Sequence, residues 1–119
     1  MRDFRKLKVW EKSHDLALNV YRLLRTFPFE ERFCLSDQMR RAAISVSSNI
    51  AEGCGRHGER ELSRFIKIAS GSISELEYQM LLARDLEYIG DKDYEMNGEQ
   101  LNEVKRMLNS FIRKLEANS

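Results

Sequence analysis

A short run of basic side chains is the feature of this sequence most suited to binding chemistry. Arg60, Arg64 and Lys67 recur at i, i+4 and i+7, so a helix over this segment would place all three cations on one face. Arg56 precedes them in a glycine-rich segment, and Arg41 is expected to point outward near the same side from the preceding helix. Cations in such a row bind phosphate oxygens, so the five residues form a candidate nucleic-acid-binding site.

The same row also has a simpler interpretation, as the solvated face of a helix. Glu52, Glu59 and Glu61 lie close by in the sequence and could neutralise the neighbouring cations. Contacts to phosphate would tolerate many sequences and would weaken steeply as salt rises, because each neutralised phosphate releases counterions. Salt-dependent RNA binding therefore separates the two interpretations.

Residue types that support catalysis or metal binding are few and scattered. Cys34 and Cys54 flank one predicted helix, which would hold them about 30 Å apart at ~1.5 Å of rise per residue. They cannot pair within one chain, so free buried thiols are expected. His14 falls in an apolar stripe, where a packed or rim position is expected, and His57 has only Cys54 close to it in sequence. The sequence thus predicts no catalytic residue, metal site, cofactor or small-molecule substrate.

The basic segment follows a stretch, 36–55, that has the features of one complete helix. Ser36 is a suitable N-cap, because its hydroxyl can accept a hydrogen bond from an amide of the first turn. Gly53 and Gly55 are expected to end the helix, since glycine readily adopts the left-handed conformation common at helix C-termini. Small residues such as Ala42 on the apolar face predict close approach by another helix.

Three further segments show helical periodicity, over 8–26, 59–89 and 92–117. Short connections favour antiparallel neighbours, so the chain is predicted to be an all-α, antiparallel, up-down four-helix bundle. The heptad spacing in the last segment matches the shallow crossing of a left-handed bundle. The whole chain, 1–119, is expected to be a single domain.

Glycine residues inside two of these helices predict local irregularity. Gly71 would cost about 1 kcal/mol against alanine in a helix interior, so close packing or a bend is expected there. Asn97 and Gly98 interrupt the apolar pattern of the last helix and predict a break or a frayed turn. Neither feature changes the predicted fold.

Composition and charge set the outer limits on location and partners. Of the 119 residues 33% are charged and 42% hydrophobic, and one is proline, as expected for a helical globular protein. The net charge of +1 conceals an uneven distribution: residues 1–67 carry 14 Lys/Arg against 9 Asp/Glu, and residues 68–119 carry 6 against 10. No apolar run has the length of a membrane span, and the first residues lack the apolar core of a signal peptide. A cytoplasmic location with no membrane partner is expected.

Motifs along nearly the whole chain match one known pattern. In the central helix the matching residues are Gln38, Arg40, Arg41, Ala42, Ser48, Asn49, Ile50, Ala51, Glu52, Gly53, Gly55 and Arg56, with further matches at Val9-Trp10-Glu11 and Ile68-Ala69-Ser70-Gly71-Ser72. Together they resemble the signature of the small bacterial four-helix-bundle proteins first met as open reading frames within intervening sequences of 23S ribosomal RNA genes. Cys34 and Ser47 depart from that pattern, which usually has glycine at the first position and often proline at the second.

The resemblance implies a homopentamer of up-down bundles and a distant kinship to accessory proteins of diversity-generating retroelements, which bind nucleic acid. It implies no activity, because no chemistry is established for the family. The favoured hypothesis is therefore a non-catalytic homo-oligomer that binds RNA as an accessory protein. An oligomeric protein-protein scaffold is the alternative, favoured by the near-neutral charge and the many apolar stripes. An enzyme or metal-binding bundle is the third.

The residues themselves also predict association. The third and fourth helices, roughly 45 and 40 Å long at ~1.5 Å per residue, extend beyond the first two, at under about 30 Å. Leu82, Leu86, Ile89 and Tyr94 lie in the surplus length and need cover, because large exposed apolar patches are uncommon on soluble monomers. A homo-oligomer is expected on these grounds, and the number five rests on the resemblance alone.

Overall fold

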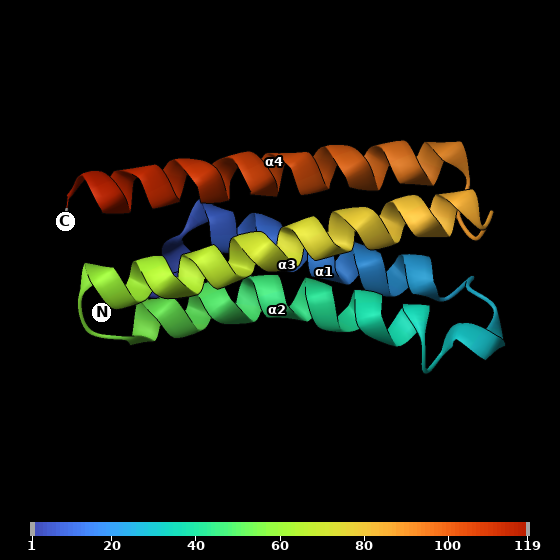
Figure 1. Cartoon of the computed structure of the whole chain (residues 1–119), viewed down its shortest axis with the longest axis horizontal. Coiled ribbons are helices and arrows are strands. Elements are labelled where there is room, and N and C mark those ends of the chain that lie inside the picture. The colour runs from blue at the N-terminus through green and yellow to red at the C-terminus, as the bar shows by residue number, and fades with distance from the viewer. Residues whose placement is uncertain (1, 119) are drawn as a thin grey trace.

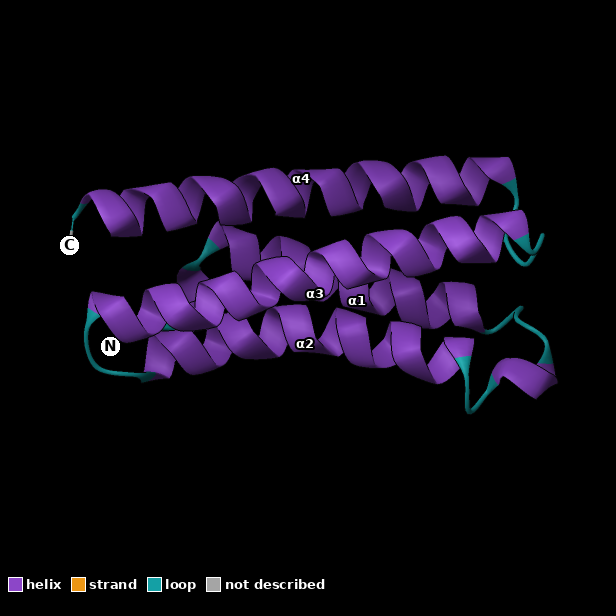
Figure 2. Cartoon of the chain, viewed as in Figure 1, coloured by secondary structure: helices purple, strands orange, loops and turns teal. Residues whose placement is uncertain are grey.

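Four long helices make up most of the structure, a computed structural model that describes residues 2–118 (Figure 1). They are α1 (Lys8–Leu24), α2 (Leu35–Gly55), α3 (Glu59–Asp85) and α4 (Asp91–Ala117), with two short 3-10 turns, η1 (Phe4–Lys6) and η2 (Phe29–Glu31). The described part of the chain contains no strand (Figure 2). The predicted all-α, four-helix fold is confirmed.

The helices close into an up-down bundle around one core. Each long helix packs against the next along the chain, and α1 also packs against α4. Successive helices run in opposite directions (Figure 1), in a molecule measuring 45 × 23 × 20 Å. Side chains that recur at helical spacing fill the centre without any exposure, and they include Val20, Met39, Ile50, Ile66, Ile73, Leu76, Val104 and Leu108.

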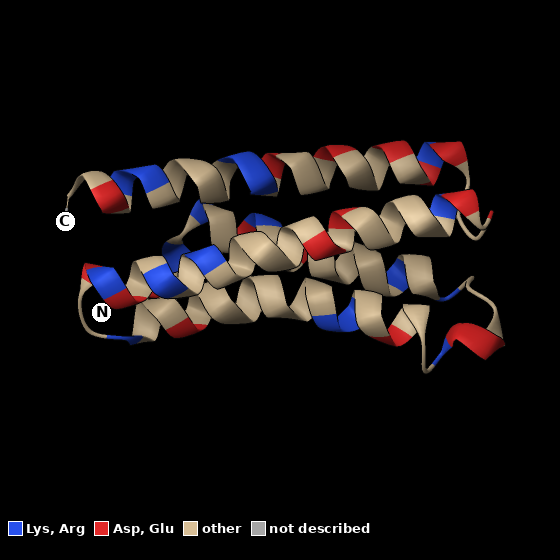
Figure 3. Cartoon of the chain, viewed as in Figure 1, with Lys and Arg blue, Asp and Glu red and all other residues tan. Residues whose placement is uncertain are grey.

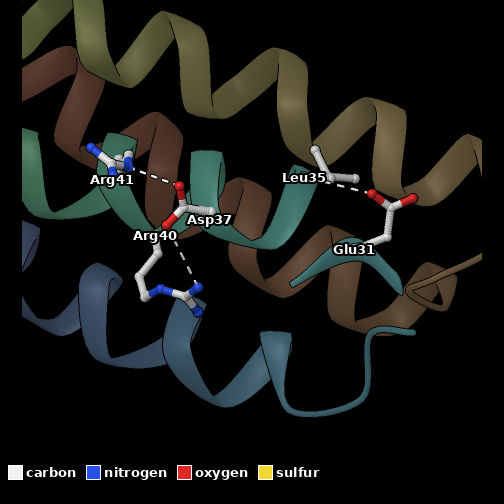
Figure 4. A network of polar contacts seen from close by, with 5 residues as sticks. All are labelled: Glu31, Leu35, Asp37, Arg40 and Arg41. Carbon is white, nitrogen blue, oxygen red and sulfur yellow. Dashed lines mark hydrogen bonds and ion pairs between the residues drawn. The ribbon is translucent and has the colours of Figure 1, made fainter. Parts of the chain in front are cut away.

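The start of α2 differs from the prediction. The helix begins at Leu35, so Ser36 lies inside the first turn, where it is buried and cannot serve as the N-cap. The Leu35 amide instead donates to Oε1 of Glu31 in η2 at 3.3 Å, which satisfies an amide that the helix leaves unpaired (Figure 4). Oε2 of Glu31 accepts a 2.8 Å hydrogen bond from the Tyr88 hydroxyl, and this bond raises the pKa of Tyr88. Glu31 thus joins the start of α2 to the segment after α3.

Glycine at the end of α2 serves packing rather than a left-handed turn. Gly55 is the last residue of the helix, and among the described glycines only Gly58 has a positive φ, of 88°. The predicted left-handed cap at Gly53 or Gly55 is therefore wrong. A Cβ atom at Gly53 would lie 2.9 Å from Cβ of Phe65 and 3.1 Å from Cδ1 of Leu62. Gly53 allows α2 and α3 to approach closely where they meet.

α3 ends four residues earlier than predicted, at Asp85. Glu87 adopts a left-handed φ of 65°. The Tyr88 amide donates to the Ala83 carbonyl at 2.9 Å, and the Glu87 amide donates to the Arg84 carbonyl at 2.9 Å. These are the two hydrogen bonds of a Schellman motif, in which glycine usually holds the left-handed position. Because Glu87 holds this position in place of glycine, the sequence gives no indication that the helix ends here.

Replacing Glu87 with glycine should stabilise the protein by about 1 kcal/mol. A left-handed conformation costs an L-residue roughly 1–2 kcal/mol, and the greater freedom of glycine in the unfolded chain removes part of the gain. Urea denaturation of wild type and Glu87→Gly measures the difference. Glu95→Gly is the matched control, because Glu95 is exposed inside α4 and glycine there should destabilise by about 1 kcal/mol. Equal destabilisation by both variants would contradict the motif.

Neither of the two helices that contain an internal glycine is interrupted. α4 is continuous through Asn97 and Gly98, so the predicted break is wrong. The Asn97 side-chain amide donates to the Asp93 carbonyl one turn earlier at 2.8 Å. α3 is also continuous through Gly71, where a Cβ atom would meet nothing within 4 Å, so the close packing predicted there is not found in this chain. α1 ends at Leu24, two residues short of the prediction.

Most of the apolar surface expected to need a second subunit is covered within the chain. Ile89 is buried, and Leu82 and Tyr94 are partly buried against the core. Leu86 is the exception, with 45% of its surface exposed. Ile89 therefore needs no cover from another copy, whereas Leu82 and Tyr94 are only partly covered by their own chain and Leu86 stays exposed.

Candidate nucleic-acid interface

Charged side chains are divided along the bundle axis. When each long helix is split at its middle residue, the end formed by 2–16, 46–72 and 105–118 has 13 Lys/Arg against 7 Asp/Glu. The opposite end, 17–45 and 73–104, has 7 against 12. The two are called the basic end, with a net charge of +6, and the acidic end, with −5. Figure 3 shows the division along α3 and α4.

The predicted row of cations lies at the basic end. Arg60, Arg64 and Lys67, called the basic stripe, are exposed on the first turns of α3. They line a hollow of about 350 Å³ whose wall also includes Ser63 of α3 and Leu115 of α4. The helical spacing therefore places these three side chains together, as the sequence predicted.

Carboxylates share this hollow with the basic stripe. Nε of Arg64 lies 3.1 Å from Oε2 of Glu61, and this hydrogen bond lowers the pKa of Glu61 and raises that of Arg64. Nζ of Lys67 lies 3.6 Å from Oε1 of Glu116, whereas Arg60 makes no ion pair within residues 2–118. Exposed ion pairs are weak in water, so a phosphate group can replace either carboxylate.

Arg56 joins the basic stripe through an aromatic ring. The guanidinium carbons of Arg56 and Arg64 lie 5.1 and 4.5 Å from the ring centroid of Phe65. Arg56 is also 3.9 Å from the carboxylate of Glu52 in the last turns of α2. Stacking on Phe65 orients both guanidinium groups at the start of α3. The predicted proximity of Arg56 to the stripe is confirmed.

Arg41 does not lie with the other four candidates. It precedes Arg56, the residue directly after α2, by 15 residues, which places it about 22 Å away along the helix axis at ~1.5 Å per residue. Its Nε donates to Oδ2 of Asp37 at 2.8 Å, and Arg40 lies 3.9 Å from the same carboxylate (Figure 4). The prediction that Arg41 shares a surface with the basic stripe is wrong, because the two ends of α2 lie at opposite ends of the bundle.

The structure adds cations that the sequence analysis missed. Arg106, Arg113 and Lys114 in the second half of α4 belong to the basic end, and so does Arg2 before η1. They are far from the basic stripe in sequence, and antiparallel α4 returns its last turns to the start of α3. The predicted up-down topology was the signal that could have located them. In that topology the end of α4 lies at the same end of the bundle as the start of α3.

Only a minority of the signature residues of α2 pack in the core, and half of the twelve are exposed. Ala42 and Ile50 are buried in the core. The Asn49 side-chain amide donates to the Ser45 carbonyl at 2.7 Å, and the Ser45 and Ser72 hydroxyls are 2.8 Å apart across α2 and α3. The first contact lies within α2, and the second joins α2 to α3.

Groups that could support other chemistry lie apart. In residues 2–118, no three His, Cys, Asp or Glu side chains are placed to hold a metal ion. Both cysteines are free; Cys34 is exposed, contrary to the prediction, whereas Cys54 is buried and burial raises the pKa of its thiol. His14 is exposed and stacks on Trp10 with ring centroids 5.0 Å apart, which confirms the rim position.

Among the described helices, none combines the length and the apolar character that a membrane span requires.

The fold and the charge distribution define a small four-helix bundle with one basic and one acidic end. The chain belongs to the 23S rRNA-intervening sequence protein family, whose sequence profile matches residues 5–110. It is also similar to a crystal structure of a protein of unknown function from the S23 ribosomal protein family of Bacteroides thetaiotaomicron. That match has a TM-score of 0.82 at 27% identity and covers 88% of this chain and 95% of the other. A comparison with curated proteins gave no match. The resemblance noted in the sequence is confirmed.

Proposed function

We propose that this protein is a non-catalytic, homo-oligomeric accessory protein that binds RNA through its basic end in the cytoplasm. The observation that carries the proposal is the concentration of positive charge at one end of the bundle. There Arg56, Arg60, Arg64 and Lys67 are exposed beside the last turns of α4, which add further cations. Cations spaced along a surface bind the phosphate backbone with little regard to base sequence.

Association of several copies would strengthen such a site. Repeated basic ends allow one RNA molecule to make several weak contacts at once, which raises the overall affinity by orders of magnitude without new kinds of contact. Large apolar side chains on the outside of the bundle support association, because they gain from being covered. They are Leu18, Tyr21, Ile44, Ile68, Tyr78, Leu81, Leu86 and Met96. A pentamer is proposed on the family resemblance alone.

Reversing the charge of the basic stripe should weaken RNA binding at least about tenfold. The variant Arg60→Glu/Arg64→Glu/Lys67→Glu removes three phosphate contacts, so the slope of log affinity against log salt should become shallower by about 3. Fluorescence anisotropy with a structured RNA at low and moderate salt measures both quantities. The matched control is Arg22→Glu/Arg25→Glu/Arg41→Glu, which changes the net charge equally through exposed arginines of the acidic end.

The control should retain most of the affinity of the wild type, since its substitutions lie away from the basic stripe. Helicity and oligomeric state of both variants are checked by circular dichroism and light scattering. Equal binding by the stripe variant and the wild type, or no binding by either, would remove the basic stripe from the function. A stoichiometric transition metal in the purified protein would contradict the non-catalytic part of the proposal.

A protein-protein scaffold is the second candidate, and one observation favours it. Phe29 and Phe33 at the acidic end are 71% and 78% exposed, and the guanidinium carbon of Arg32 lies 3.6 and 4.6 Å from their ring centroids. Exposed aromatic residues flanking an arginine are common at protein interfaces. A bound protein that survives nuclease treatment and is lost in Phe29→Ser/Phe33→Ser, without salt-dependent RNA binding, would favour the scaffold.

A further inference from the structure

A second hollow at the basic end lies between the start of α1 and the last turns of α4. Its volume is about 360 Å³, within the range of small-ligand sites, about 300–1,000 Å³. Leu7, Met107 and Phe111 form an apolar floor and are partly buried against the core. The hollow is called the α1–α4 pocket.

Cations surround this apolar floor. Arg2, Lys8 and Lys114 line the pocket, and no carboxylate does so among the described residues. The hollow beside the basic stripe differs, because Glu59, Glu61 and Glu116 line it. The α1–α4 pocket is therefore the more strongly cationic of the two, and it combines that charge with an aromatic ring.

Arg2 is held in place at the rim of the pocket. Its amide donates to the Cys54 carbonyl at 2.9 Å, and its guanidinium lies 2.9 Å from the carboxylate of Glu59 and 5.6 Å from the ring centroid of Phe111. Lys8 and Lys114 make no ion pair within the part of the chain that the structure describes. The pocket thus offers one oriented guanidinium plane and two ammonium groups available to an anion.

We propose that the α1–α4 pocket binds an unpaired nucleotide of RNA. Its base would lie against Phe111 and the guanidinium of Arg2, since aromatic rings and guanidinium planes both stack on bases. Its flanking phosphates would contact Lys8 and Lys114. Bases inside an A-form duplex are stacked on each other and cannot enter such a pocket. The inference rests on the proposed function and assigns to it single-stranded segments as the substrate class.

The position of the pocket connects it to the basic stripe. Arg2 also lines a smaller hollow of about 140 Å³, together with Arg56 and Glu59, and Glu59 lines the hollow of the stripe as well. A strand leaving the α1–α4 pocket past Arg2 therefore reaches Arg56 and then the stripe. Phosphates on either side of the bound nucleotide would meet cations along this path.

The test compares wild type, Phe111→Leu and Phe33→Leu for binding a fluorescent oligouridine strand and a blunt RNA duplex of equal length. Phe111→Leu keeps an apolar side chain but removes the ring, so affinity for the single strand should fall about fivefold or more while duplex binding is unchanged. Phe33→Leu makes the same change at an exposed ring of the acidic end and should alter neither. In a second measurement, 4-thiouridine in the single strand should cross-link to the peptide containing Met107 or Phe111.

The outcomes separate the pocket from the proposed function. Unchanged single-strand affinity in folded Phe111→Leu, or cross-links confined to other segments, would overturn the pocket while duplex binding through the basic stripe still stands. If the wild type binds neither RNA form, both proposals fail. If an acidic aromatic peptide binds in a Phe111-dependent manner and RNA does not, the pocket is a protein-binding site and the inference is wrong.

Discussion

Replacing Gly53 with alanine is expected to destabilise the protein by about 1–3 kcal/mol, near the upper end of that range. The added Cβ atom would lie 2.9 Å from Cβ of Phe65 and 3.1 Å from Cδ1 of Leu62. Cβ of Phe65 belongs to the base of its side chain, so no rotamer change moves it away and the ends of α2 and α3 must separate. The better helix propensity of alanine offsets only about 1 kcal/mol.

The same substitution at Gly71 provides the control, with the opposite sign. A Cβ atom at Gly71 meets nothing within 4 Å, so Gly71→Ala should stabilise the protein by roughly 0.5–1 kcal/mol. Urea denaturation of the two variants and wild type at one protein concentration measures both changes. A neutral or stabilising Gly53→Ala would contradict the close packing of α2 on α3. A destabilising Gly71→Ala would show that another surface covers Gly71.

The Gly53 site also bears on the candidate interface. Phe65, the residue that a larger side chain at 53 would displace, is the ring over which Arg56 and Arg64 stack. Gly53 therefore acts on the basic end through packing, without touching a ligand. One buried signature residue of α2 is thus linked by packing to a surface built mainly by α3.

The sequence predicted the helices but not all of their ends, and the misses at the start of α2 and the end of α3 have the same physical reason. The apolar periodicity of a long helix is repeated over many residues, so it survives a few exceptions. A cap depends on one contact, and that contact can come from outside the helix. Glu31 accepts from the start of α2 although it lies in η2, and Glu87 adopts the left-handed conformation that glycine usually takes.

The candidate site divides in the same way between local and tertiary information. Arg60, Arg64 and Lys67 share a face because their spacing alone dictates it. The positions of Arg41 and Lys114 depend instead on which end of the bundle each part of a helix occupies, and that is set by the tertiary fold. The α1–α4 pocket was beyond sequence reasoning, because its floor exists only where α1 packs on α4.

Truncating Ile73 to alanine is expected to destabilise the protein by about 2–5 kcal/mol, the largest single effect predicted here. Ile73 lies at the centre of α3 with 0% of its surface exposed, among the core side chains of the bundle. Removing its methyl and methylene groups loses their transfer energy and leaves a cavity that long, mutually packed helices cannot easily close. Denaturant unfolding followed by circular dichroism measures the loss.

Ile68→Ala is the matched control. It makes the same isoleucine-to-alanine change in α3, but at a side chain that is 42% exposed. In an isolated bundle, Ile68→Ala should change stability by no more than about 0.5 kcal/mol. If copies of the chain cover this face, the loss should instead grow with protein concentration, because only an associated state is stabilised by mass action. Measuring both variants at two concentrations a hundredfold apart therefore separates the core from a subunit contact. A large, concentration-independent loss at Ile68 would contradict the orientation of α3, while a small loss at Ile73 would contradict the core itself.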